Sequence, residues 1–127
     1  MSESDTYELL MNGFSEVSRI LDEKNSTLVA DPILAELVRI AAQDPSSDGV
    51  KLALLQVLGS RDMSAAVEIV QYFAQSLRWN WLQIEVRQRY VESVTNGDRR
   101  KIRHYERMLE AFSADWEDRD LFPSLDS

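Results

Sequence analysis

Residues 31–59 read DPILAELVRIAAQDPSSDGVKLALLQVLG, and residues 62–94 read DMSAAVEIVQYFAQSLRWNWLQIEVRQRYVESV. In both stretches apolar residues recur at spacings of three and four, as in helices that bury one face. A shift of 32 residues aligns the two stretches, placing Glu36 on Glu68, Val38 on Val70 and Gln43 on Gln75. One offset serves both helices of each stretch and the loop between them, so the pattern predicts two helix-pair repeats over residues 31–94.

Cap and turn residues divide the rest of the chain. Asp31-Pro32 predicts a helix start after a connection over residues 23–31, because an acidic cap followed by proline is a common opening. Asp62 is the expected cap of the next repeat's first helix. Ser46-Ser47-Asp48 is expected to open the helix before it, and Asn96-Gly97-Asp98 predicts a turn and a new cap. Strand-type alternation is absent. We therefore expect one all-α domain, residues 1–127, with about six helices; it comprises an N-terminal helix (5–22), the two repeats, a C-terminal helix (97–115) and an acidic tail (116–127).

Composition limits the chemistry available to the chain. Of 127 residues, 44% are hydrophobic, none is cysteine and one is histidine, His104. This composition leaves no thiolate site and no multi-histidine metal site, and no glycine-rich phosphate loop or nucleophile elbow is present. We expect a non-enzymatic protein without cofactor or metal. An acidic start and a longest apolar run of Leu52-Ala-Leu-Leu55 predict a cytoplasmic protein without a membrane span.

Charge is unevenly distributed along the chain, whose formal net charge is −8. Residues 1–77 carry 12 acidic and 5 basic groups, residues 78–113 carry 5 and 8, and residues 114–127 carry 5 and 1. An acidic face suits a basic protein partner, because complementary potentials speed encounter, whereas it repels duplex nucleic acid. The alternative is that the acidic surface serves solubility alone.

Two stretches carry a family resemblance. Residues 61–77, RDMSAAVEIVQYFAQSL, resemble the first helix of a HEAT-like or armadillo-like repeat, and residues 79–87, WNWLQIEVR, resemble the Val-Arg opening of the second. The sequence departs from that pattern at Leu77-Arg78-Trp79, where the family often has aspartate, and its unit is shorter than the usual one of about 40 residues. The resemblance implies a short α-solenoid or layered helical bundle that acts as a binding scaffold.

Trp79 and Trp81 are candidate partner-binding residues, because tryptophan is enriched at interface hot spots. Two positions apart at a helix start, they are expected to point in different directions, one into the core and one toward the surface. The alternative is that both pack between neighbouring repeats.

The last predicted helix carries an arginine row, Arg99, Arg103 and Arg107, each four residues apart. Together with Arg100, Lys101 and the nearby Arg87 and Arg89, this row suits phosphate or an acidic partner. Two alternatives remain: a solvated helix face, or neutralisation by the oppositely charged tail folding back.

The tail alternates acidic and large apolar residues, which is typical of a short linear ligand for a basic, grooved partner. The alternative is a terminal cap that docks the two aromatic side chains over the open end of the helical array. The candidate residues are Asp115, Trp116, Glu117, Asp118, Asp120 and Phe122.

Together these patterns favour a non-catalytic helical module that presents an acidic surface to a basic protein partner, with a bacterial toxin-immunity protein as the most natural concrete role. The alternatives are a self-assembling structural or regulatory protein, in which residues 78–113 of one copy meet the acidic half of another, and a nucleic-acid binder that uses the arginine row.

Overall fold

The structure is a computed structural model that describes residues 3–60 and 65–126. Within these residues the chain forms six α-helices, two short 3₁₀ helices and no strand, which confirms the all-α prediction. Asp62, the expected cap, lies outside the described residues. The elements are α1 (Glu3–Lys24), α2 (Thr27–Gln43), α3 (Asp48–Gly59), α4 (Ala66–Leu77), α5 (Asn80–Asn96), α6 (Arg99–Glu110), η1 (Glu117–Leu121) and η2 (Pro123–Asp126).

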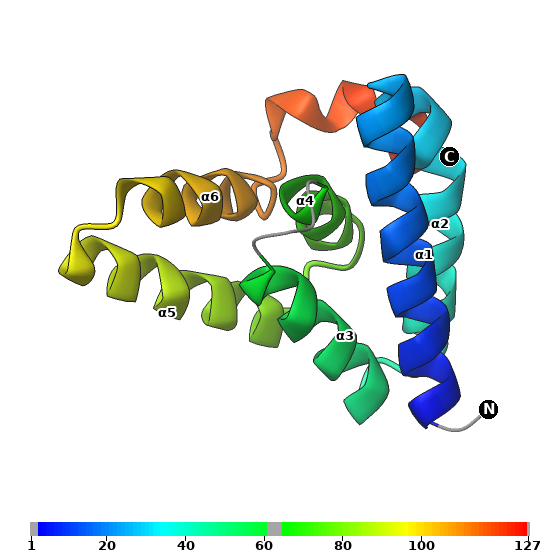
Figure 1. Cartoon of the computed structure of the whole chain (residues 1–127), viewed down its shortest axis with the longest axis horizontal. Helices are drawn as coiled ribbons and strands as arrows, with labels where there is room; N and C mark the ends of the chain where they lie inside the picture. Colours follow the sequence, from blue (N-terminus) through cyan, green and yellow to red (C-terminus); the bar gives the residue numbers. More distant parts are fainter. Residues whose placement is uncertain (1–2, 61–64, 127) are drawn as a thin grey trace.

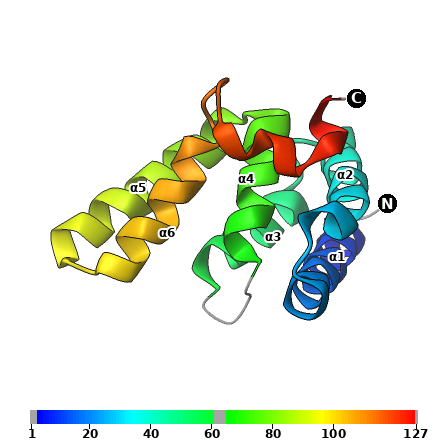
Figure 2. The same cartoon turned by 90° about the horizontal axis from the view of Figure 1, so that it is seen from above.

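Two antiparallel helix pairs lie at opposite ends of the molecule (Figure 1). One pair is α1 and α2; the other, α5 and α6, is the α5–α6 arm. Between them, α3 packs on α1 and α4, while α4 also packs on α2 and α6. Figure 2 shows η1 and η2 crossing over α4, from the end of α6 to α2.

The helices pair differently from the predicted repeats. Those repeats require α2 to pack on α3 and α4 on α5, but the most extensive contacts join α1 to α2 and α5 to α6. The reason lies in α4, which buries side chains on every side and packs against α1, α2, α3 and α6. An apolar face at helical spacing shows that a helix is covered, not which helix covers it. The structure does not confirm the solenoid.

The start of α2 corrects a sequence prediction. Asn25, in the left-handed conformation with φ of 49°, ends α1, and α2 begins at Thr27 rather than at Asp31. Pro32 therefore lies inside the helix, where it forgoes the hydrogen bond to the Leu28 carbonyl. Asp31 is not an N-cap; it is buried, 4% exposed, and its carboxylate has a partner in the tail.

Other caps follow the sequence signals. The Ser47 hydroxyl accepts a hydrogen bond from the Gly49 amide at 3.1 Å and opens α3. The Asp98 carboxylate accepts from the Lys101 amide at 3.3 Å and opens α6. Gly97, with φ of 68°, forms the tight turn that makes α5 and α6 a hairpin.

Candidate functional site

The tail is docked onto the helical body by its two aromatic side chains. Phe122 is 1% exposed and packs edge-on against Tyr72 of α4, with ring centroids 5.4 Å apart. Trp116, also buried, stacks on Phe122 at 6.0 Å. The structure thus gives Trp116 and Phe122 an internal role, as in the alternative where the tail caps the fold, and does not present them to a partner. Burial of these two large aromatic rings removes more apolar surface from water than exposure to a partner site would in the free protein.

A buried carboxylate fixes the end of the tail. The backbone N–H of Ser124 lies 3.3 and 3.2 Å from the two carboxylate oxygens of Asp31, and the Ser124 hydroxyl donates to the same carboxylate. The Tyr72 hydroxyl lies beside this group. Its burial, together with the negative charge of Asp31, raises the pKa of Tyr72 to about 12, although a hydrogen bond with Ser124 opposes the shift.

Two buried glutamines of α4 hold the end of α6. The Gln75 amide donates to the carbonyls of Ala111 and Ser113 at 2.8 and 2.9 Å, and that of Gln71 donates to the Arg107 carbonyl at 3.0 Å. They satisfy carbonyls that a helix end leaves unpaired. The Gln75 side-chain oxygen accepts from Arg119 of the tail. Sequence reasoning missed this network, although two glutamines four positions apart in an apolar helix were a signal.

Docking leaves a row of carboxylates on the outside, which we call the acidic ledge. A cavity of about 400 Å³ opens beside it, lined in part by Glu110 and Trp116. Asp115 accepts a hydrogen bond from the Ser113 hydroxyl, which with a backbone hydrogen bond holds the pKa of Asp115 below its ordinary value and keeps it charged. The ledge consists of the exposed residues Asp115, Glu117, Asp118 and Asp120.

The arginine row does not neutralise the ledge. Within residues 3–60 and 65–126, no ion pair joins an arginine of α6 to an acidic residue of the tail. Arg107 instead lies 3.8 Å from Glu68 of α4, and Arg99 and Arg103 are exposed on the arm. The hypothesis of a tail folded back onto the arginines is therefore wrong, because the aromatic and Asp31 contacts draw the tail across α4 toward α2.

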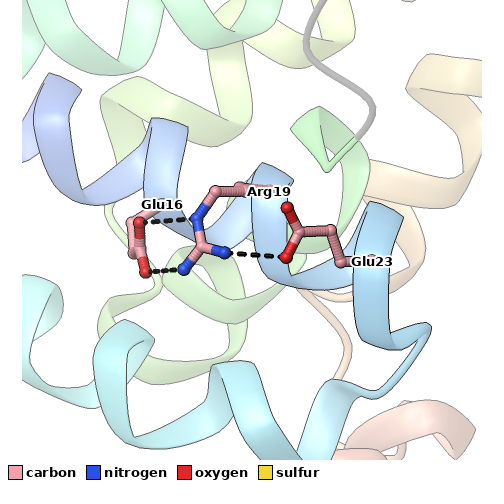
Figure 3. Close-up of polar contacts among 3 residues, drawn as sticks. All are labelled: Glu16, Arg19 and Glu23. Atoms are coloured by element: carbon pink, nitrogen blue, oxygen red, sulfur yellow. Dashed lines mark hydrogen bonds and ion pairs between the residues drawn. The ribbon is translucent and has the colours of Figure 1, made fainter.

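On α1 and α2 two arginines are paired with acidic neighbours. Arg19 donates to Glu16 and, at 2.8 Å, to Glu23 (Figure 3). The hydrogen bond from Arg19 holds the pKa of Glu16 below its ordinary value. Arg39 pairs in the same way with Glu36. Exposed pairs of this kind add little stability, but they leave a surplus of negative charge at this end of the molecule.

The two tryptophans at the start of α5 also correct a prediction. Trp79 and Trp81 do not point apart; their rings stack, with centroids 6.1 Å apart, and both are partly buried. Trp79 precedes the helix in an extended conformation, so the helical rotation assumed for the pair does not apply. The Lys51 ammonium lies 5.9 Å from the Trp81 ring centroid. Both rings pack against the hydrophobic core.

Comparison with protein-family models, with curated proteins and with solved structures finds no match for this chain. Among the described residues, no helix combines the length and apolarity needed to cross a bilayer. In the same part of the chain, no group of three or more His, Cys, Asp or Glu side chains is placed to hold a metal ion. The class that the fold itself defines is a small all-α protein.

Proposed function

We propose that this chain is a cytoplasmic, non-catalytic protein-binding module whose acidic ledge receives a basic segment of a protein partner. The observation that supports the proposal is the docking of the tail. Buried Trp116 and Phe122 hold Asp115, Glu117 and Asp118 in fixed positions at the surface, and the arginines of α6 do not pair with them. A fixed array loses less conformational entropy on binding than a disordered acidic tail would.

The cavity beside the ledge suggests how a partner engages. Its volume of about 400 Å³, with carboxylates of Glu110, Glu117 and Asp118 in its lining, suits an inserted lysine or arginine side chain. The negative surface of α1 and α2 steers such a partner from a distance, an effect that salt screens. A bacterial toxin-immunity protein, which covers the working surface of a basic toxin, is the concrete role we propose.

The test is affinity purification of the tagged chain from its native cells at low and high salt, with mass spectrometry of the retained proteins. A ledge variant, Asp115→Asn, Glu117→Gln and Asp118→Asn, is compared with the unmodified chain. The matched control removes three exposed carboxylates that lie outside the ledge and outside α1 and α2, in the variant Asp44→Asn, Glu92→Gln and Glu106→Gln.

We expect one basic protein in near-equal amount, retained by the control and lost by the ledge variant, with both variants melting near the parent temperature. Equal retention by the two variants would overturn the role of the ledge. Recovery of the bait alone at both salts would count against protein binding altogether.

Self-assembly is a second candidate, favoured by the different charge balance of the two helix pairs, which lie at opposite ends of the molecule (Figure 1). Each end also exposes apolar side chains: Leu28 and Val29, 64% and 48% exposed, on α2, and Val91 and Val94, 55% and 50% exposed, on α5. Contact between unlike ends builds rings or filaments rather than closed dimers. Sedimentation at high concentration and low salt tests it, and a persistent monomer excludes it.

A further inference from the structure

A second cavity, of about 690 Å³, lies between the end of α3, the first turn of α4 and the stretch of α6 from its cap Asp98 to Arg107. We call it the basic trough. Leu58, Gly59 and Val67 form its apolar floor. The Tyr105 hydroxyl donates to the Leu58 carbonyl at 3.2 Å and fixes α6 against the end of α3. The opening is therefore built by tertiary contacts between three elements rather than by one mobile side chain.

Two arginines, a lysine and the histidine line one wall of the trough. Arg100, His104 and Arg107 follow each other at helical spacings of four and three, so they share one face of α6, and Lys101 lies beside them. Among the described residues of the lining, Asp98 carries a carboxylate, which is engaged with the Lys101 amide as the cap of α6. The excess of positive charge makes this cavity opposite in sign to the one beside the acidic ledge.

The trough also divides the predicted arginine row. Of Arg99, Arg103 and Arg107, only Arg107 lines the cavity; Arg100 joins it because α6 turns that face toward α3 and α4. The spacing of four groups Arg99, Arg103 and Arg107, whereas the cavity brings together Arg100, Lys101 and Arg107. Position relative to neighbouring helices, which spacing alone does not report, decides which cations converge.

We propose that the basic trough binds a compact anion that carries two or more phosphate groups, such as pyrophosphate or a nucleoside triphosphate. Guanidinium groups bind phosphate oxygens bidentately, and Arg100 and Arg107 stand on either side of His104 to do so. The volume lies within the range of about 300–1,000 Å³ typical of small-molecule sites.

The concave shape favours a small ligand over a nucleic-acid duplex. A duplex contacts cations spread along a surface, and on α6 that surface would include Arg99 and Arg103, which are exposed outside the trough. The two ligand classes therefore predict different arginines, and this difference makes a matched pair of variants possible on one helix.

The experiment is calorimetric titration of the full chain with pyrophosphate, and separately with adenosine triphosphate, at low salt. The trough variant is Arg100→Gln with Arg107→Gln, and the control is Arg99→Gln with Arg103→Gln, which has the same net charge. Because Arg107 also lies near Glu68, Arg100→Gln alone is measured as well.

We expect the trough variant to weaken binding about tenfold or more, since each charge-assisted hydrogen bond is strong, and the control to weaken it less than threefold. The His104 ring proton, from the one histidine of the chain, should shift with the same dissociation constant. Equal weakening by both variants, tighter binding to a short duplex than to pyrophosphate, or no binding at millimolar pyrophosphate would each overturn the proposal.

Discussion

Replacing Phe122 by alanine tests whether the tail belongs to the core. The ring is 1% exposed and contacts the rings of Tyr72 and Trp116. Truncation of a buried phenylalanine lowers the free energy of unfolding by about 3–5 kcal/mol. The loss cannot exceed the free energy that docks the tail, because the tail of a weakened variant can detach from the helical body. For a chain of this size, a loss of about 3 kcal/mol lowers the melting temperature by roughly 10 °C.

The assay is urea unfolding followed by circular dichroism and by tryptophan fluorescence. Detachment exposes Trp116, so the native emission of Phe122→Ala should shift to longer wavelength before the main transition. Leu121→Ala is the control, because Leu121 is the preceding residue of the same tail and is 48% exposed; it should change stability by less than about 0.5 kcal/mol. Equal effects of the two variants would refute the docked tail.

Three further outcomes follow. Gly13→Ala should destabilise the chain despite better helix propensity, because a Cβ there would lie 2.3 Å from Cδ2 of buried Leu37; a raised melting temperature would contradict this. Tyr72, whose pKa is raised to about 12, contributes stability that is present below pH 10 and is lost as the pH rises toward 12. In Tyr72→Phe the urea concentration at the midpoint of unfolding should therefore fall less steeply with pH between 10 and 12. His104 has its pKa lowered by burial and by Arg107, so stability should fall as pH drops below 6.5; an NMR pKa above 6.5 would disprove it.

The sequence predicted where the helices lie along the chain more reliably than which elements pack against one another. Caps such as Ser47 and Asp98 act within a few residues, and the structure places both as expected. The prediction that Asp31-Pro32 opens a helix was wrong, because Asp31 is buried inside α2 instead of capping it. Its carboxylate accepts hydrogen bonds from Ser124, 93 positions away. No local pattern reports such a partner.

The same contrast between local pattern and tertiary contact applies to the candidate functional residues. The sequence identified these residues by their type, but the path of the tail across α4 decides which of their side chains are buried and which are exposed. That path buries Trp116 and Phe122, leaves Asp118 exposed, and separates the arginines of α6 from the ledge. The stacking of Trp79 on Trp81 depended on the extended backbone before α5, which the helical pattern did not indicate.

The α5–α6 arm buries little of itself: Leu82, Val86 and Ser93 on α5, and Tyr105 and Met108 on α6. A hairpin with so few anchors opens at a lower free energy than the whole protein, as a separate cooperative unit that hydrogen exchange detects. Its amide protons should exchange before those of α4. Because α6 forms one wall of the basic trough, an anion bound there would slow that exchange in proportion to its concentration, and the opening of the arm would become a measure of ligand supply.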